Sequence, residues 1–271
     1  MDKSSKVAIL GSGNIGLSLA RGLVKSEYST PHKITLTRRN IQQLAMESEQ
    51  GYQVTEQNYQ AVSESSIIIL AVLPQQLNTL LEEIKDAIDP EKHLIISIIS
   101  GVSCQNIREK LGSDVQVIRA MPNTAIAIGQ SMTCIATDNA NDENVTEVTK
   151  MFETVGSVIE INEELMTSAT ALCACGIAFF LRAIRAASQG GVEIGFHADE
   201  ALKMAVQTAK GAADLLLLNH SHPEHEIDKV TSPKGCTIAG LNEMEHRGFS
   251  SSLIKGIKFS AIKAGELYTK K

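Results

Sequence analysis

A glycine-rich turn near the N-terminus constrains the fold of this chain more than any other feature. In "KVAILGSGNIGLSLARGL" a short apolar run leads into Gly11, Gly13 and Gly16, and a helix-forming segment follows. In such a strand–turn–helix unit the first glycine permits the tight turn, the second lets the backbone approach a pyrophosphate, and the third lets helix and strand pack closely. The helix N-terminus adds free N–H groups and a positive dipole. The predicted dinucleotide-binding residues of this turn are Gly11, Ser12, Gly13, Asn14, Ile15 and Gly16.

Short β-rich runs alternate with polar, helix-length segments up to about residue 161. The runs are "KVAIL", "KITLT", "SIIILAV", "HLIISII", "VQVIRA", "MTCIAT" and "GSVIEI". Continuous apolar strands are typical of a parallel sheet that helices cover on both faces. An alternating order of strands and helices predicts a doubly wound fold. We therefore expect an α/β, Rossmann-like N-terminal domain with a mostly parallel sheet over residues 1–162.

After Asn162 the β-rich runs stop and the pattern becomes helical. Three segments carry broad apolar surfaces: "EELMTSATALCACGIAFFLRAIRAASQGGVEIG", "HADEALKMAVQTAKGAADLLLL" and "FSSSLIKGIKFSAIKAGELY". A helix that is apolar nearly all round must be buried, and a second subunit can bury it. We therefore expect an all-α dimerisation and substrate domain over residues 163–271 that forms a homodimer. The alternative is a monomeric helical cap packed on the sheet.

Composition and charge argue against several classes of protein. The net charge of -6 disfavours a nucleic-acid-binding protein, and the lack of a run of about 18 apolar residues predicts no membrane span. Five cysteines and an N-terminus without a secretory pattern favour free thiols in the cytoplasm, with Cys173 and Cys175 in a packing role. His220, His222 and His225 lack supporting ligands, so we expect a solvated connector there and no metal site.

The end of the second strand indicates which dinucleotide binds. An NAD site usually carries Asp or Glu there to bind the ribose hydroxyls, but this chain reads Thr37, Arg38 and Arg39. A guanidinium binds a 2′-phosphate through two charge-assisted hydrogen bonds, whereas a carboxylate repels it. The sequence therefore predicts NADP(H), with NADPH preferred over NADH. The alternative is that both arginines are solvated surface residues.

Two further strand ends are expected at the same edge of the sheet. In doubly wound sheets ligands bind outside the carboxyl ends of the strands. The segments "AVLPQQ" and "SIISGV" end the fourth and fifth runs, so we expect these residues along the cofactor: Ala71, Val72, Pro74 and Ser100.

Three segments resemble the pyrroline-5-carboxylate reductase family. "RAMPNTAIAIGQSMT" is similar to the family pattern R-x-M-P-N-T-P-x-x-x-G-x-G, and "VTSPKGCTIAGLNEMEHRGF" is similar to V-T-S-P-G-G-T-T-x-x-G-L-x-x-L-E-x-x-G. "ATALCACGIAFF" falls where the family has A-L-S-G-S-G-P-A-Y. The resemblance covers essentially the whole chain. It implies an NAD(P)H-dependent reduction of the cyclic imine 1-pyrroline-5-carboxylate to L-proline, by dimers that often assemble further, commonly as decamers.

The resemblance also implies roles for individual residues. The loop at residues 232–237 binds the substrate carboxylate through backbone N–H groups and a hydroxyl, and Thr237 lies near the ring nitrogen as the one catalytic residue. Asn58 helps hold the cofactor ribose, and Glu163 lies near the nicotinamide. The substrate residues implied are Ser232, Pro233, Lys234, Gly235, Cys236, Thr237 and Glu163. The remaining cofactor residues implied are Met121, Pro122 and Asn123.

The departures from the family pattern gather at the substrate end. Lys234 replaces a glycine, which implies a different or costly backbone angle, and Cys236 removes one hydroxyl. Ile177 stands where the family has proline, which predicts a straighter helix. Three readings stay open: the reduction named above, a paralogous NADP-dependent reductase of another cyclic imine or a keto or hydroxy acid, and a non-catalytic NADP-binding regulator.

Overall fold

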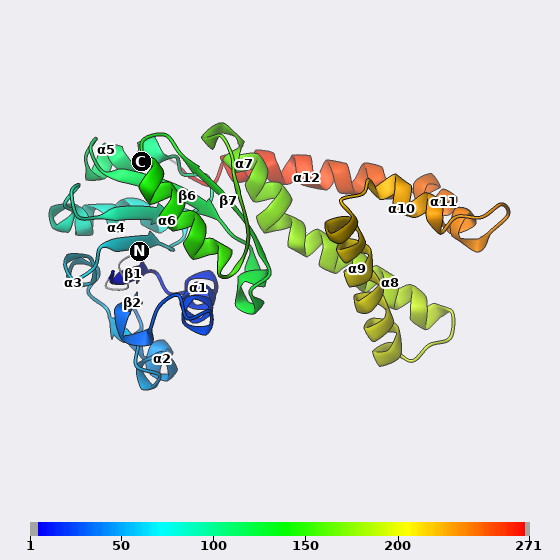
Figure 1. Ribbon diagram of the computed structural model, residues 1–271, viewed down its shortest axis with the longest axis horizontal. Coiled ribbons are helices and arrows are strands. Elements are labelled where there is room, and N and C mark those ends of the chain that lie inside the picture. The colour runs from blue at the N-terminus through cyan, green and yellow to red at the C-terminus, as the bar shows by residue number, and fades with distance from the viewer. Residues whose placement is uncertain (1–4, 269–271) are drawn as a thin grey trace. The chain divides into compact units, whose positions relative to one another are not determined.

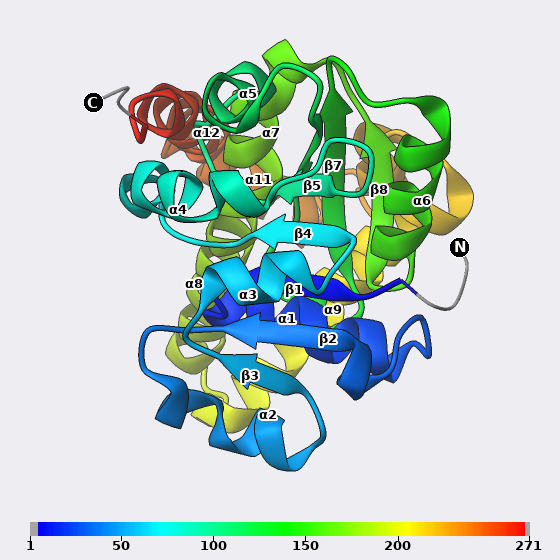
Figure 2. The same ribbon diagram turned by 90° about the vertical axis from the view of Figure 1, so that its left-hand side faces the viewer.

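Seven of the strands form where the β-rich runs predict them. The computed structural model describes residues 5–268, and within this range eight strands form one sheet in the order β3-β2-β1-β4-β5-β6-β7-β8 (Figures 1 and 2). The strands are β1 Val7–Leu10, β2 Ile34–Thr37, β3 Gln53–Thr55, β4 Ile67–Leu70, β5 Leu94–Ser97, β6 Gln116–Met121, β7 Ser131–Thr137 and β8 Gly156–Glu160. All neighbouring pairs are parallel except β6 and β7. The predicted mostly parallel, doubly wound sheet is confirmed.

Helices within residues 14–153 cover both faces of this sheet. The α-helices are α1 Asn14–Lys25, α2 Ala45–Glu49, α3 Asn58–Ser63, α4 Leu77–Ile84, α5 Cys104–Leu111, α6 Asp142–Glu153, α7 Met166–Ala169, α8 Gly176–Glu193, α9 Ala198–Asn219, α10 Pro223–Lys229, α11 Cys236–His246 and α12 Phe249–Gly265. Every residue of β1, β2, β4 and β5 is buried. Such burial on both faces is why β1, β4 and β5 are nearly all apolar, while in β2 two apolar residues alternate with two buried threonines.

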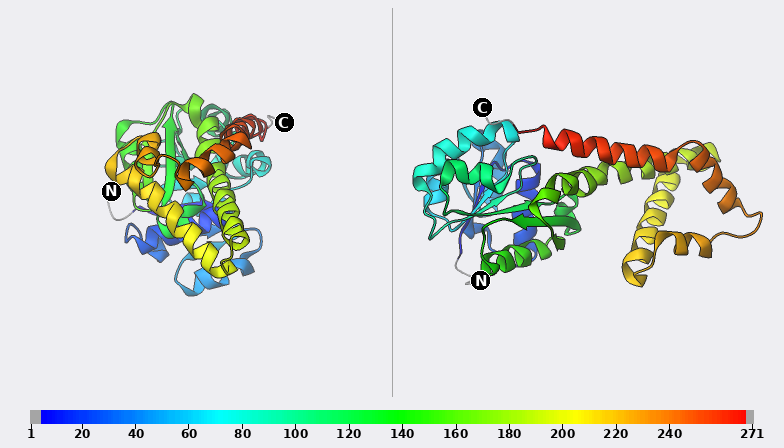
Figure 3. Two further views of the ribbon diagram at one scale, coloured as in Figure 1. Left: turned by 90° about the vertical axis from the view of Figure 1, so that its right-hand side faces the viewer. Right: turned by 90° about the horizontal axis from the view of Figure 1, so that it is seen from above.

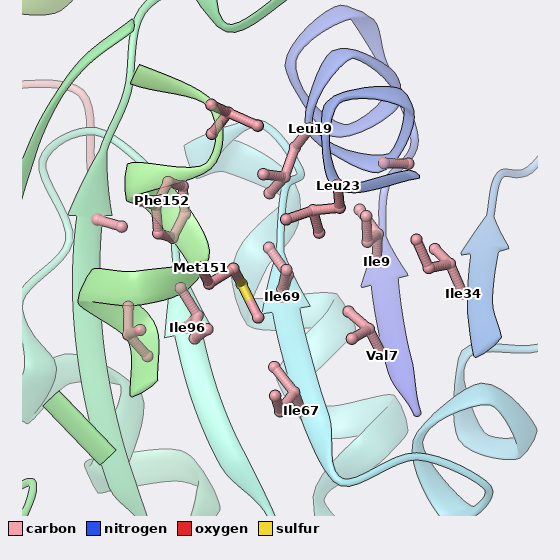
Figure 4. Close-up of a cluster of buried hydrophobic side chains, with 14 of the residues drawn as sticks. Val7, Ile9, Leu19, Leu23, Ile34, Ile67, Ile69, Ile96, Met151 and Phe152 are labelled. Atoms are coloured by element: carbon pink, nitrogen blue, oxygen red, sulfur yellow. The ribbon is translucent and has the colours of Figure 1, made fainter. Parts of the chain in front are cut away.

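The core lies in two layers, one on each face. On one face Leu19 and Leu23 of α1 and Phe152 of α6 pack over alternate strand residues such as Ile9 and Ile69 (Figure 4). On the other face the helices α3, α4 and α5 pack over the intervening strand residues. The alternation of side chains between the faces fixes the register of each strand against its helices.

The chain separates into two compact units. Unit 1 comprises Met1–Cys175 with Ser260–Lys271, and unit 2 comprises Gly176–Phe259. In this division α7 and the π-helical segment Thr170–Cys175 belong to unit 1. The domain boundary at residue 162 that the sequence suggests stays a prediction. In unit 2, α8 and α9 pack against each other (Figure 3).

The helical region departs from the sequence expectations at two points. The π-helical segment Thr170–Cys175 directly precedes α8, which contains Ile177, and the sequence did not predict that segment. The straighter helix expected from the loss of proline stays a prediction. In the histidine-rich connector, α10 begins at Pro223 and the His222 side chain accepts a hydrogen bond from the Glu224 N–H at 3.3 Å. A proline in the first turn and a capping side chain explain that short helix.

One stretch bears on the predicted absence of a membrane span. Within the described residues, Glu163–Glu193 is long and apolar enough to cross a membrane by length and composition alone. Such a helix is weak evidence for a span, because core helices of other proteins pass the same test. The absence of a membrane stays a prediction.

Candidate functional site

The glycine turn has the geometry that a phosphate-binding loop needs. Gly11 has a φ of 92°, and a Cβ there would lie 2.5 Å from Val72 Cγ1 and 3.0 Å from the Ala71 carbonyl carbon and oxygen. Only glycine fits that position without strain. A Cβ on Gly13, by contrast, would meet no atom within 4 Å, so the turn is open at the residue expected to face the pyrophosphate.

The first turn of α1 has unused hydrogen-bond donors. Gly13 is the N-cap, no side chain caps the helix, and its first turn carries no acidic residue. The leading N–H groups of a helix lack intrahelical acceptors and carry a partial positive charge. The start of α1 can therefore bind an anionic group such as a phosphate.

Contacts with the end of β2 fix the position of the glycine turn. The Gly11 N–H donates to Thr37 Oγ1 at 3.2 Å, and the Ser12 N–H donates to the Thr37 carbonyl at 2.8 Å. Arg38 Nη1 donates to the Ser12 carbonyl at 3.0 Å. The Arg38 guanidinium thus lies beside the turn, while the Arg39 side chain is exposed. These contacts place two predicted nucleotide-binding segments together.

Asn58 and Glu83 extend this network. Thr37 Oγ1 donates to Asn58 Oδ1 at 2.6 Å, and Asn58 Nδ2 donates to Glu83 Oε2 at 3.0 Å. Asn58 begins α3, so its side chain lies at the carboxyl end of β2, as a ribose contact requires. Glu83 is a residue that sequence reasoning missed, because it lies in α4, 25 residues further along the chain.

The ends of β4, β5 and β6 form the rest of this edge. Pro74 follows β4 at the start of a short 3-10 helix, and Ser100 Oγ contacts Met121 Sδ at 3.8 Å. Asn123 is largely buried: its N–H donates to Ser131 Oγ at 3.0 Å and its Nδ2 donates to the Cys173 carbonyl at 3.3 Å. The predicted cofactor residues of unit 1 lie at the glycine turn, at or after the ends of β2, β4, β5 and β6, and at the start of α3 in the case of Asn58. The strand order reverses between β1 and β4. Such switch points bind ligands in doubly wound sheets.

A buried ion pair joins β6 to the start of the helical region. Arg119 Nη1 donates to Glu163 Oε1 at 3.3 Å, and the Cys104 N–H donates to the same oxygen at 2.6 Å. Arg119 is only 4% exposed, and its Nε and Nη2 have no hydrogen-bond partner among the described residues. Burial lowers the pKa of Arg119, while the Glu163 carboxylate opposes that shift. The predicted contact of Glu163 near a nicotinamide stays a prediction.

Near this ion pair, three of the described side chains are of types that bind metal ions. Cys104, Asp138 and Glu163 offer ligand atoms within 4.8 Å of one another. Arg108 pairs with Asp138 and Arg119 pairs with Glu163, so each carboxylate already has a cation. Burial raises the pKa of the Cys104 thiol, which keeps its proton. The cluster is therefore a charge-balanced network, and we infer no metal from it.

The loop of residues 232–237 in unit 2 forms a tight turn into α11. The Gly235 N–H donates to the Ser232 carbonyl at 2.9 Å, and a Cβ on Gly235 would lie 2.5 Å from Ser232 Oγ. Gly235 is the N-cap of α11, with no side-chain cap and no acidic residue in the first turn. Thr237 is half-buried in that turn, whereas Lys234 and Cys236 are exposed. The turn therefore offers backbone donors to an anion in the same way as the start of α1.

The backbone at Lys234 has the costly conformation that is expected where a lysine replaces a glycine of the family pattern. Its φ is 56°, which lies in the left-handed region that favours glycine. Among the described residues only Glu27 and His220 share this feature without being glycine. Lys234 therefore has a backbone conformation that glycine favours, and its side chain is exposed.

Comparison with known families and proteins agrees with this geometry. Residues 163–267 match the family model "Pyrroline-5-carboxylate reductase dimerisation", and residues 6–101 match "NADP oxidoreductase coenzyme F420-dependent". Pyrroline-5-carboxylate reductase 2 of Dictyostelium discoideum is 48% identical over 282 residues, which cover 98% of this chain and 94% of that protein. The chain belongs to the pyrroline-5-carboxylate reductase family.

Two further members of this reductase family are similar to nearly the whole of this chain. Pyrroline-5-carboxylate reductase 1 of Dictyostelium discoideum is 53% identical over 277 residues, covering 98% of this chain and 50% of that protein, so the chain spans about half its length. The crystal structure of 1-pyrroline-5-carboxylate reductase from Streptococcus pyogenes is 27% identical with a TM-score of 0.89. It covers 98% of this chain and 100% of that one, so the reductase fold extends over essentially the whole chain.

Proposed function

We propose that this protein reduces 1-pyrroline-5-carboxylate to L-proline with NADPH, the last step of proline biosynthesis. The observation that carries the proposal is the turn at residues 232–237, whose N–H groups lead into the uncapped start of α11. The turn provides donors for the carboxylate of a small acid, and it occurs in a chain whose sheet has a separate dinucleotide-binding edge. Membership of the reductase family supports the same reaction.

The residues at the edge of the sheet fit NADP. Gly13 leaves open space, the start of α1 is uncapped, and β2 ends in Thr37 and two arginines instead of a carboxylate. When bound, NADPH supplies hydride from C4 of its nicotinamide. Arg38 and Arg39 would hold the 2′-phosphate, Asn58 the ribose, and the ends of β4, β5 and β6 the nicotinamide half. The match to an NADP oxidoreductase model over residues 6–101 supports this assignment.

The substrate chemistry needs positioning more than a strong base. A protonated cyclic imine is electrophilic at carbon, so holding the ring in the right orientation supplies much of the rate acceleration. We assign the carboxylate to the N–H groups of Cys236 and Thr237, because the Gly235 N–H already donates to the Ser232 carbonyl. We assign the ring nitrogen to the Thr237 hydroxyl. Thr237 is then a hydrogen-bond partner or proton conduit and does not form a covalent bond.

A substrate panel tests the proposed function. Among five- and six-membered cyclic imino acids, NADPH oxidation should be fastest with 1-pyrroline-5-carboxylate. With that substrate, turnover with NADPH should be faster than turnover with NADH. Faster turnover of another cyclic imine would show a paralogous reductase, which the exposed Lys234 and Cys236 favour as the second candidate. NADPH binding without turnover of any panel member would show a regulator.

We expect Lys234 to lower the stability of the protein and to strengthen substrate binding. A side chain in the left-handed region costs roughly 1 kcal/mol relative to glycine, so Lys234→Gly should raise the free energy of unfolding by about that amount. The same change removes an ammonium near the substrate carboxylate and should raise the KM for the imino acid about threefold, as an exposed ion pair is worth up to ~1 kcal/mol. Urea unfolding and steady-state kinetics measure the two effects.

Glu27→Gly is the matched control for this variant. Glu27 has a φ of 60° and lies after α1, outside the substrate loop. It should gain similar stability with the KM for the imino acid unchanged. A Lys234→Gly enzyme whose KM stays at the wild-type value would remove Lys234 from the substrate site.

A homodimer through unit 2 is part of the same proposal. Large apolar side chains are exposed along α8 and α9: Phe180, Leu181, Val192, Leu202, Met204, Val206, Leu215, Leu217 and Leu218. So many exposed large apolar side chains on two helices that pack against each other favour a protein–protein interface. The family model over residues 163–267 is a dimerisation model, which supports the predicted homodimer. The assembly of such dimers into a decamer stays part of the proposal. Five free cysteines support the proposed cytoplasmic location.

Charges on α9 should dissociate this dimer. Leu217 and Leu218 are 70% and 79% exposed, and replacing both with glutamate would place two carboxylates in an apolar interface. Unpaired buried charges cost several kcal/mol each, so the double variant should sediment as a monomer at micromolar concentration while wild type sediments as a dimer or larger. Met46→Glu, at an exposed site of α2 in unit 1, is the control and should not change the sedimentation coefficient. A double variant that sediments like wild type would contradict the interface.

A further inference from the structure

Two cysteine thiols from distant parts of the sequence face each other within unit 1. Cys134 lies on β7 and Cys173 lies in the π-helical segment Thr170–Cys175, and their Sγ atoms are 3.7 Å apart. Cys134 belongs to a small buried cluster, and Cys173 packs against its edge. Cys173 therefore packs against this cluster, as the sequence predicts, and its side chain also contacts a second thiol.

The separation of the sulfurs is close to what a disulfide needs. A disulfide has an S–S length of about 2.05 Å, so sulfurs 3.7 Å apart must approach by about 1.7 Å. Rotation about the Cα–Cβ bonds moves each Sγ along an arc and is the motion by which the two sulfurs would approach. The backbone of β7 is held by β6 and β8, so Cys173 is the partner whose segment adjusts.

The two thiols also differ in reactivity. The contact with the Cys134 thiol lowers the pKa of Cys173, against the opposing effect of burial. The same contact raises the pKa of Cys134, which is 4% exposed and keeps its proton. Cys173 is half-buried. One thiolate that an oxidant can reach and one protonated resolving thiol are what a redox-active pair requires.

We propose that Cys134 and Cys173 are a redox modification site that forms a reversible disulfide with a peroxide oxidant. The Cys173 thiolate attacks a peroxide oxygen, the O–O bond breaks, and Cys173 becomes a sulfenic acid as hydroxide leaves. The Cys134 sulfur then bonds to Cys173 Sγ, the S–O bond breaks, and water leaves with the Cys134 proton. Two thiols lose two electrons, one peroxide becomes two waters, and a dithiol reductant restores both thiols.

The position of the pair connects it to the predicted cofactor edge. Cys134 is the strand partner of Met121, and the Cys173 carbonyl accepts the hydrogen bond from Asn123 Nδ2 at 3.3 Å. The disulfide therefore ties the segment that holds Asn123 to β7. A transient disulfide of this kind suits a reducing compartment, where such bonds are mostly redox-sensing or catalytic.

Peptide mapping of the full chain after treatment with hydrogen peroxide tests the site. We expect a Cys134–Cys173 linked peptide under non-reducing conditions, a loss of two titratable thiols out of five, and recovery of both with dithiothreitol. Cys175→Ser, two residues away, should form the same linked peptide. Cys173→Ser should form none and should leave Cys134 available for alkylation after denaturation.

Three results would overturn the proposal. They are a wild-type protein in which Cys134 and Cys173 both stay reduced while other thiols oxidise, a linkage of Cys173 to any other cysteine, and a Cys173 that proceeds to sulfinic acid with Cys134 still reduced. None of these depends on the proposed reductase activity, because the measurement follows the thiols and not turnover.

Discussion

Replacing Thr237 with alanine should lower kcat by about 100-fold, the size of effect expected for a lost proton-transfer partner. Thr237 is half-buried in the first turn of α11, beside the N–H groups that we assign to the substrate carboxylate. Removing its hydroxyl leaves the ring nitrogen without its hydrogen-bond partner when the imine is protonated and reduced. The Kd for NADPH should not change, because the glycine turn and the arginines bind the cofactor. Pre-steady-state and steady-state turnover with 1-pyrroline-5-carboxylate measure the loss.

Thr237→Ser is the matched control. It keeps the hydroxyl and should recover most of the lost kcat, whereas a purely structural role for the threonine methyl group would leave the serine variant as slow as the alanine variant. An alanine variant within twofold of the wild-type kcat would refute the role of Thr237.

The second large effect concerns cofactor choice. Replacing Arg38 and Arg39 together with alanine should raise the KM for NADPH about 30-fold and the KM for NADH less than about threefold, because charge-assisted hydrogen bonds contribute roughly 1.5–3 kcal/mol each. Arg38 lies against the Ser12 carbonyl, so its guanidinium is already positioned beside the turn. Steady-state kinetics with both cofactors measure the split.

Lys110→Ala provides the control for lost positive charge. Lys110 lies in the last turn of α5 and pairs with Glu82 of α4, so it is not among the predicted cofactor residues. Its removal should change neither KM. A double arginine variant in which the KM values for NADPH and NADH rise equally would mean that the arginines stabilise the turn and do not bind the 2′-phosphate.

The sequence predicts most of the sheet because its signals are local. Strands such as Ile67–Leu70 are buried on both faces and therefore read as apolar runs, and the glycine turn follows directly after β1. The strand β3, Gln53–Thr55, was not expected, since it is short, polar and partly exposed at the sheet edge. Edge strands bury little side-chain surface and so leave little trace in composition.

The contacts that complete the candidate site are long-range and left no local signal. Arg119 and Glu163 are 44 residues apart, and Cys134 and Cys173 are 39 apart, so only the fold brings them together. The resemblance located residues 232–237 and correctly identified the backbone constraint at Lys234. The residues of that loop stay predictions as substrate contacts until the variants above are measured.

Isotope transfer tests the central claim most directly. We would incubate the protein with 1-pyrroline-5-carboxylate and NADPH carrying deuterium at both C4 positions of the nicotinamide, and analyse the product by mass spectrometry and NMR. Hydride transfer to the imine carbon predicts L-proline with a single deuterium at C5. Recovery of unlabelled proline, or NADPH consumption without any proline, would contradict the proposed reduction.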